Sequence, residues 1–269
     1  MKKLSVYFSI TLCLSILTFC ACSSGSVKLE HIGLTGKYYL AESSTQGVFT
    51  ISIQMELPVG YVEDSIRSFL VTAIFGEKYV QYANTLIPQL YATELEQDYK
   101  DCNEPLFSEI EDEEHFYSFN NDHVMEGFSL LNDGKIFSYG FTRYSYMGGA
   151  HGLNTGSYYN FDLKTARLIT EQDLFVDDYE EALIELFKIR IVEDSETLQT
   201  LDDLKKSDYE IDLIKPNGNF YISDEAITYV FNPYEIAPYY MGQTEISIPY
   251  TRITHLLKTK SPVDYLVKN

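Results

Sequence analysis

The hydrophobic period of this 269-residue chain switches repeatedly between the spacing of strands and the spacing of helices, and that succession constrains the fold most. Residues 48–57 alternate strictly between apolar and polar side chains, which predicts a half-buried strand. Apolar residues then recur at helical spacing from Val62 to Ile74, where Gly76 ends the pattern, and again over 89–100 after Pro88. Two helices are therefore predicted after the first strand.

The remainder of the chain returns to strands and then combines helices with strands. Strands are predicted over 124–131, 135–146, 156–163, 220–222, 226–231 and 245–250, and a terminal helix over 251–257. Thr170 and Asp173 form a capping-box pattern before a short helix, and Asp177 or Asp178 is expected to cap a longer one. Blocks of strands and helices without βαβ alternation predict an α+β fold, mainly antiparallel sheet with packed helices.

The N-terminus has the features of a lipoprotein signal. Lys2 and Lys3 precede an apolar stretch, residues 4–19, that is too short for a stable membrane span. Cys22 follows the small residue Ala21 and is the predicted lipidation site, with residues 1–22 as the signal peptide. An ordinary cleaved signal peptide is the alternative. Either reading places the mature chain in the cell envelope, and a lipid anchor would leave it facing the periplasm or the cell surface.

The charge balance limits the classes of partner. The chain has 20 Lys and Arg against 40 Asp and Glu, a formal net charge of −20. This argues against nucleic acid, and it disfavours anionic lipid heads apart from the N-terminal anchor. Cationic partners are favoured through electrostatic steering, although solubility alone would also account for the charge. The densest acidic run, residues 109–114, lacks the glycine spacing of a calcium loop and is predicted to be solvated.

No residue pattern supports catalysis, a metal or another cofactor. The five histidines, His31, His115, His123, His151 and His255, do not fall at metal-binding spacing. Cys102 is the one cysteine left after the signal region and is predicted to be a buried small hydrophobe. No nucleophile pattern such as G-x-S-x-G is present. The interpretation therefore leans against an enzyme and assigns no catalytic residue.

Two aromatic, glycine-containing motifs carry a family resemblance. The first runs from Tyr144 through Gly148-Gly149-Ala150-His151-Gly152 to Asp162, and the second from Asn232 to Tyr250. Together they resemble the DUF3298-type envelope domain found in RsiV-like lysozyme-sensing anti-sigma proteins and beside PdaC-like peptidoglycan deacetylase domains. The likeness covers residues 140–258 well, while the N-terminal half resembles the companion DUF4163-type domain only loosely.

The resemblance implies an architecture of two α+β subdomains. Residues 23–36 are then a polar tether, 37–143 an N-terminal subdomain and 144–262 a C-terminal one. The metal site of the deacetylase relatives belongs to a separate catalytic domain and has no matching motif here. A lipid anchor instead of the transmembrane helix of the anti-sigma relatives makes direct sigma-factor signalling unexpected.

The candidate binding residues come from the same two motifs. The first motif contributes Tyr144, Tyr146, Gly148, Gly149 and His151, and the second contributes Tyr234, Tyr239 and Tyr240. Tyrosine gives rigid amphipathic contact area, and irregular loops carry function more often than regular strands do. The competing interpretation is structural: the tyrosines pack against sheets and His151 caps a tight turn.

The leading hypothesis is a non-catalytic, lipid-anchored binding module for a cationic protein such as a lysozyme-type muramidase. The alternatives are a protein that binds or processes peptidoglycan glycans and a purely structural envelope lipoprotein. In the structural case, replacing Tyr239, Tyr240 or His151 would lower stability and change no binding.

Overall fold

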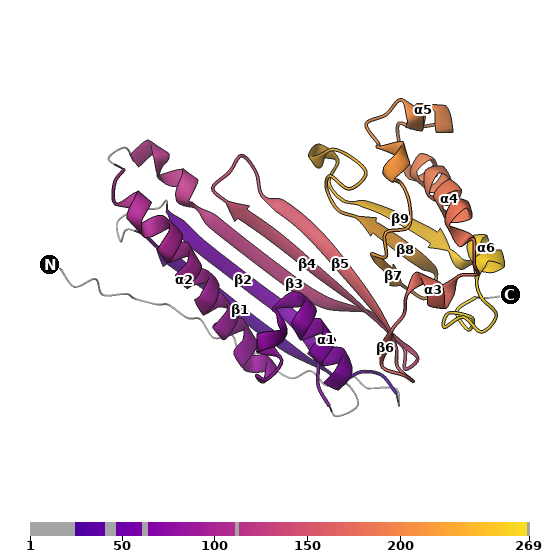
Figure 1. The fold of residues 1–269 in the computed structure, drawn as a ribbon, viewed down its shortest axis with the longest axis horizontal. Coiled ribbons are helices and arrows are strands. Elements are labelled where there is room, and N and C mark those ends of the chain that lie inside the picture. The colour runs from indigo at the N-terminus through magenta and orange to yellow at the C-terminus, as the bar shows by residue number, and fades with distance from the viewer. Residues whose placement is uncertain (1–24, 41–46, 61–63, 111–112, 268–269) are drawn as a thin grey trace. The chain divides into compact units, whose positions relative to one another are not determined.

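The computed structural model describes residues 25–40, 47–60, 64–110 and 113–267, so the predicted signal peptide and Cys22 lie outside the described residues. Strands β1 to β6 form a six-stranded sheet in sequential order, and β7, β8 and β9 form a second sheet (Figure 1). The predicted α+β class with mainly antiparallel sheet is confirmed. None of the helices in the described ranges is long and apolar enough to cross a membrane.

Two compact units share the described chain. Unit 1 contains residues 28–127 and 142–153, and unit 2 contains 25–27, 128–141 and 154–267. The chain passes from unit 1 to unit 2 within strand β3 (Asn121–Asn132), between residues 127 and 128. It returns to unit 1 within strand β4 (Ile136–Met147), between residues 141 and 142. The single boundary predicted at 143/144 differs from this division, because both strands of one hairpin contribute residues to each unit.

In unit 1, two helices cover a sheet. Strands β1 (Leu29–Tyr39) and β2 (Val48–Pro58) are antiparallel, and β3 joins β2 in parallel. The alternation predicted over 48–57 buries Phe49, Ile51, Ile53, Met55 and Leu57. Helices α1 (Asp64–Ile74) and α2 (Ile87–Phe107) pack on these strands, as Figure 1 shows.

Three details of unit 1 depart from the sequence-based expectations. Residues 29–36 of the predicted tether belong to β1, where Ile32 and Leu34 are buried; glycines among the alternating residues hid this strand. Helix α2 continues past the predicted end at residue 100 to Phe107, with Pro105 in its last turn. Cys102 is exposed on this helix, so the prediction of a buried cysteine was wrong.

Unit 2 packs helices on the three-stranded sheet. Its remaining elements are β5 (Leu153–Asp162), β6 (Arg167–Leu168), α3 (Glu171–Leu174), α4 (Tyr179–Asp194), α5 (Leu201–Lys205), β7 (Phe220–Ile222), β8 (Ala226–Phe231), β9 (Thr244–Pro249) and α6 (Tyr250–Ile253). Phe187 of α4 contacts Tyr229 of β8, with ring centroids 4.7 Å apart. The capping box of Thr170 and Asp173 is confirmed. Asp178 stands at the N-cap of α4 with φ 62°, one of the two predicted positions, although its side chain makes no capping hydrogen bond.

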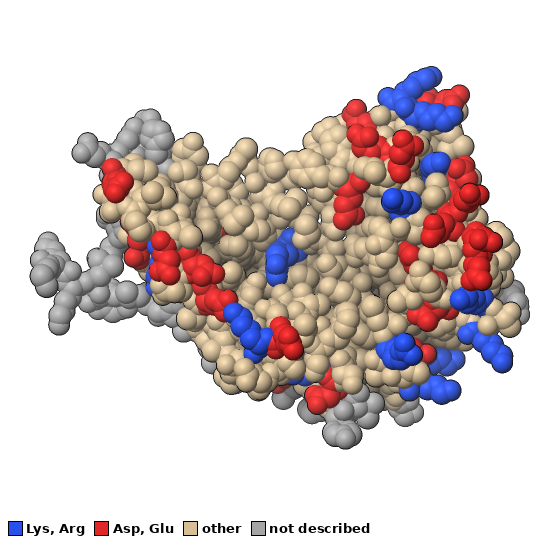
Figure 2. Space-filling model, in the orientation of Figure 1, with Lys and Arg blue, Asp and Glu red and all other residues tan. Residues whose placement is uncertain are grey.

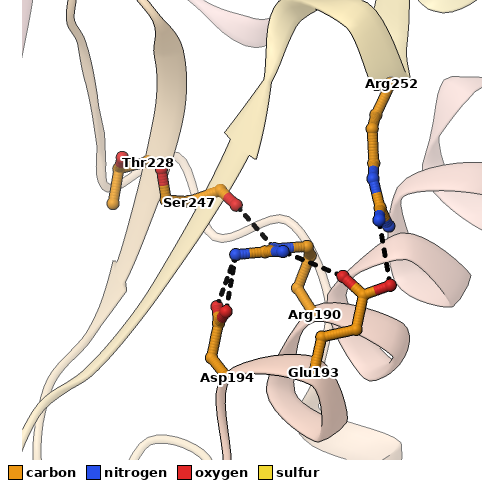
Figure 3. Close-up of polar contacts among 6 residues, drawn as sticks. All are labelled: Arg190, Glu193, Asp194, Thr228, Ser247 and Arg252. Carbon is orange, nitrogen blue, oxygen red and sulfur yellow. Dashed lines mark hydrogen bonds and ion pairs between the residues drawn. The ribbon is translucent and has the colours of Figure 1, made fainter.

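Side chains form hydrogen bonds with backbone groups at both edges of the three-stranded sheet in unit 2. The amide of Asn160, on β5, accepts from the Ile222 N–H at 2.9 Å and donates to the Phe220 carbonyl at 2.7 Å, so it pairs with β7 as a strand would. On the opposite edge, Arg190 of α4 donates to the Ser247 carbonyl of β9 at 2.9 Å (Figure 3). These contacts satisfy backbone groups that would otherwise lack a partner at the edges of a sheet.

Arg190 also organises an ion-pair network. Its guanidinium contacts Asp194 and Glu193, and Glu193 in turn pairs with Arg252 of α6 at 2.9 Å (Figure 3). The hydrogen bond from Arg252 is the main reason that the pKa of Glu193 lies below its usual range. The network ties the end of α4 to β9 and α6.

Candidate binding surfaces

The glycine-rich loop of the first motif belongs to unit 1, and close packing fixes its shape. Gly148 has φ 76°, and a Cβ there would lie 1.7 Å from the Ser118 carbonyl oxygen. A Cβ on Gly152 would lie 2.4 Å from the ring of Tyr144. Gly149, in contrast, has no such atom within 4 Å. Gly148 and Gly152 are therefore required for backbone and ring packing, whatever the loop binds.

The side chains of this first motif fall into two groups. His151 is exposed, and its Nδ1 lies 3.1 Å from the Gly152 carbonyl oxygen. Met147 is 72% exposed at the end of β4, whereas Tyr144 and Tyr146 are half-buried. Tyr144 packs over Gly152, which agrees with a structural role for that ring. The surface available to a partner is therefore formed by Met147 and His151 more than by the predicted tyrosines.

The second motif forms an exposed aromatic surface in unit 2, which we call the tyrosine ledge and define as Tyr234, Tyr239 and Tyr240. Tyr234 and Tyr239 stack with centroids 5.7 Å apart and an interplanar angle of 29°. Tyr234 is 61% exposed and Tyr240 is 72% exposed. All three predicted tyrosines of this motif lie in the connection between β8 and β9: Tyr234 is in a turn, and the half-buried Tyr239 and the exposed Tyr240 are in the 3₁₀ helix Tyr239–Met241.

Backbone geometry holds the ledge in place. Tyr234 has φ 73°, a conformation that is costly for a bulky residue and tends to persist at functional sites. Its N–H donates to the Ala237 carbonyl at 3.1 Å, and Ile236 and Ala237 anchor the turn in the core. The ring of Tyr234 is thus directed outward by a turn that the interior of unit 2 fixes.

Carboxylates border the ledge. The Tyr240 hydroxyl donates to the Asp208 carboxylate, and this hydrogen bond raises the pKa of Tyr240 above its usual value. Glu235 follows Tyr234 and is also exposed. Glu235 accepts hydrogen bonds from the backbone and side chain of Asn232, which keep the carboxylate fixed. A partner with basic groups around an apolar contact would complement this surface.

A shallow hollow of about 390 Å³ lies beside the ledge. Asn217, Asn219, Asn232 and Glu235 line it, together with Gly156 of β5. Most of the amide groups are already engaged. Asn232 accepts from the Gly156 N–H at 2.7 Å, and Asn219 accepts from the Tyr158 N–H at 3.0 Å. The amide side chains that line the hollow therefore serve mainly to hold β5 in place through hydrogen bonds with its backbone.

The sequence patterns did not identify Asp208, Asn217 or Asn219. Asn-Gly-Asn at 217–219 resembles an ordinary turn, and Asp208 lies in a polar stretch without a clear period. In the described parts of the chain, no group of three or more His, Cys, Asp or Glu residues is placed to hold a metal ion. Figure 2 shows acidic side chains gathered along α2 of unit 1 and around α4 of unit 2.

Comparison with known proteins agrees with the resemblance seen in the motifs. Residues 172–251 match the family model described as "Protein of unknown function (DUF3298)". This region contains β7 to β9, helix α4 and the tyrosine ledge. The predicted resemblance to this family is therefore confirmed for residues 172–251.

Two curated proteins of Bacillus subtilis (strain 168) are similar to parts of the chain. Peptidoglycan-N-acetylmuramic acid deacetylase PdaC is 25% identical over 152 residues, which is 51% of this chain and 31% of PdaC. Anti-sigma-V factor RsiV is 33% identical over 106 residues, which is 37% of this chain and 36% of RsiV. The chain thus spans about a third of the length of either relative.

Two solved structures share the fold. A DUF3298 family member from Bacteroides fragilis NCTC 9343 (BF2082) aligns with TM-score 0.80 and 27% identity, over 89% of this chain and 96% of that one. A DUF3298 family protein from Pseudomonas aeruginosa PAO1 (PA4972) aligns with TM-score 0.61 and 16% identity, over 90% and 97% of the two chains. The second likeness concerns the fold alone.

Proposed function

We propose that this chain is a non-catalytic binding module of the bacterial cell envelope, and that the tyrosine ledge of its DUF3298 domain receives a cationic protein. The observation that carries the proposal is the ledge itself: two stacked rings and a third, highly exposed one, fixed by a strained turn and bordered by Asp208 and Glu235. Exposed, pre-organised tyrosines give contact area at low entropic cost. Their acidic surroundings select basic partners.

The names of the relatives support an envelope setting. One is named a peptidoglycan-N-acetylmuramic acid deacetylase and the other an anti-sigma-V factor. The sequence motifs also resemble those of lysozyme-sensing anti-sigma proteins. A lysozyme-type muramidase is typically basic, and this chain has a formal net charge of −20. We therefore take such a muramidase as the first partner to test, with the chain held in the envelope by a lipid on Cys22.

The test is a calorimetric titration of residues 23–269 with a basic lysozyme at low and near-physiological salt. We expect saturable one-to-one binding that weakens with salt but persists, because tyrosine contacts are not screened. Tyr240→Ala and Tyr234→Ala should weaken binding about tenfold or more, since central interface tyrosines contribute roughly 2 kcal/mol. Tyr82→Ala, at an exposed tyrosine of unit 1, is the matched control. Attraction that disappears at near-physiological salt would refute the proposal.

A second function, glycan binding, is favoured by one observation. The wall of the hollow includes the exposed carboxylate of Glu235, which is next to Tyr234 in the chain, and a carboxylate beside an aromatic ring suits sugar hydroxyls and ring faces. Peptidoglycan fragments or chitooligosaccharides should then shift the NMR signals of Asn217 and Tyr234. If these ligands bind and lysozyme does not, the glycan function replaces the protein partner. A search for turnover of the same ligands tests the non-catalytic assignment.

A further inference from the structure

Unit 1 also carries large exposed apolar side chains on segments that contact one another and lie outside the DUF3298 region. Leu106, Tyr117 and Met147 are 57%, 55% and 72% exposed, respectively. We call these three residues the unit 1 tip. They come from the end of α2, the short 3₁₀ segment Glu113–Phe119 and the end of β4. Exposed large apolar side chains that share a surface mark interaction sites more often than isolated ones do.

Contacts beneath the tip bring its three segments together. Phe107, which follows Leu106, packs against Phe116, which precedes Tyr117, with ring centroids 4.3 Å apart. The next residue after Met147, Gly148, lies against the Ser118 carbonyl. The Tyr99 hydroxyl donates to the Phe119 carbonyl at 2.9 Å, which attaches the 3₁₀ segment to α2. The framework is therefore packed while the three side chains above it stay exposed.

The segments that supply the tip carry charge of one sign. Residues 101–120 and 144–153, which supply the tip, contain seven acidic residues and no Lys or Arg. Among the described ones, Asp101, Glu104 and Glu109 are exposed. The nearest Lys in sequence on α2, Lys100, pairs with Glu96 at 2.5 Å. An apolar surface inside an acidic border would repel anionic membranes and attract a ligand that is both basic and apolar.

We infer that the unit 1 tip binds a cationic amphipathic peptide segment, with Leu106, Tyr117 and Met147 contacting its apolar face and Asp101 and Glu109 its basic side chains. Methionine suits such a surface, because its flexible thioether adapts to different apolar partners. The tip is separate from the tyrosine ledge, so this binding does not depend on the proposed lysozyme contact.

The experiment titrates residues 23–269 with a synthetic 18-residue peptide of Leu and Lys arranged to form one apolar helical face. The control peptide has the same composition with its Leu residues distributed around the helix. We expect the amphipathic peptide to bind at least tenfold more tightly than the control at near-physiological salt, by fluorescence anisotropy. The doubly substituted Leu106→Ser, Met147→Ser protein should lose at least tenfold in affinity, about 1.4 kcal/mol, because both apolar contacts with the peptide are removed.

Two further variants separate the contributions. Asp101→Asn with Glu109→Gln should weaken binding and reduce its dependence on salt, because the basic side chains lose their counter-charges. Tyr82→Ala, at an exposed tyrosine of unit 1 outside the tip and the tyrosine ledge, should leave peptide affinity unchanged. Both substitution pairs lie on exposed side chains, and far-UV circular dichroism confirms that each variant is folded.

Three results would overturn the inference. Equal binding of the two peptides would show that charge alone attracts them. Unchanged affinity in the Leu106→Ser, Met147→Ser variant would place the peptide elsewhere. Binding to neutral phosphatidylcholine vesicles that requires Met147, without peptide binding, would assign the tip to a lipid surface instead.

Discussion

Asn160 is the residue whose loss should most damage unit 2. It is 2% exposed, and its side chain makes three hydrogen bonds: from the Ser138 hydroxyl at 2.6 Å, from the Ile222 N–H at 2.9 Å and to the Phe220 carbonyl at 2.7 Å. Asn160→Ala leaves these buried backbone groups of Ile222 and Phe220 without that partner. Because each unpaired buried group costs about 1–3 kcal/mol, we expect a loss of about 2–6 kcal/mol.

That loss is large against the ~5–15 kcal/mol by which a typical domain is stable. Urea unfolding of residues 23–269, followed by circular dichroism, measures it, and hydrogen exchange at the Ile222 amide reports the local effect. Asn154→Ala is the matched control, since Asn154 lies on the same strand and is exposed. Ser138→Ala combined with Asn160→Ala should cost less than the sum of the single changes, because the two side chains share a bond.

The result for Asn160→Ala decides whether its amide connects β5 to β7. If Asn160→Ala lowers the free energy of unfolding by less than about 1 kcal/mol, as Asn154→Ala does, then water or a backbone shift replaces the hydrogen bonds to β7 equally well. Unchanged exchange at Ile222 would contradict the bond itself.

Three further predictions concern stability. Gly148→Ala should cost more than about 2 kcal/mol because of its positive φ and the clash with Ser118, whereas Gly149→Ala should be nearly neutral; thermal unfolding compares them. Burial is the main cause that lowers the pKa of His123, so below about pH 6.5 the unfolded chain binds more protons than the folded one. The free energy of unfolding should therefore fall as the pH drops from 7 toward the folded pKa. In His123→Gln, the urea midpoint should depend less on pH over that range. Arg190→Ala should cost about 1–3 kcal/mol by the same assay, because it leaves the Ser247 carbonyl and two carboxylates without this donor, and the more exposed Arg252→Ala should cost under about 1 kcal/mol.

The sequence alone determined most of the regular elements. Alternation over 48–57 and the Thr170–Asp173 capping box are local signals, since each depends on residues a few positions apart. The same holds for the tyrosine ledge, because Tyr234, Tyr239 and Tyr240 lie within seven positions of one another in the connection between β8 and β9. Strand β1 was missed where glycines interrupt its pattern.

Contacts between residues that are distant in the sequence were decided by the tertiary structure alone. The structural use of Asn160, the packing of Gly148 against Ser118 and the pairing of Tyr240 with Asp208 all join residues distant in the chain. The unit 1 tip likewise forms because three segments end together. Periodicity reports which face of an element is buried, but only the fold decides which distant polar group completes a hydrogen bond and which apolar side chain is left in water.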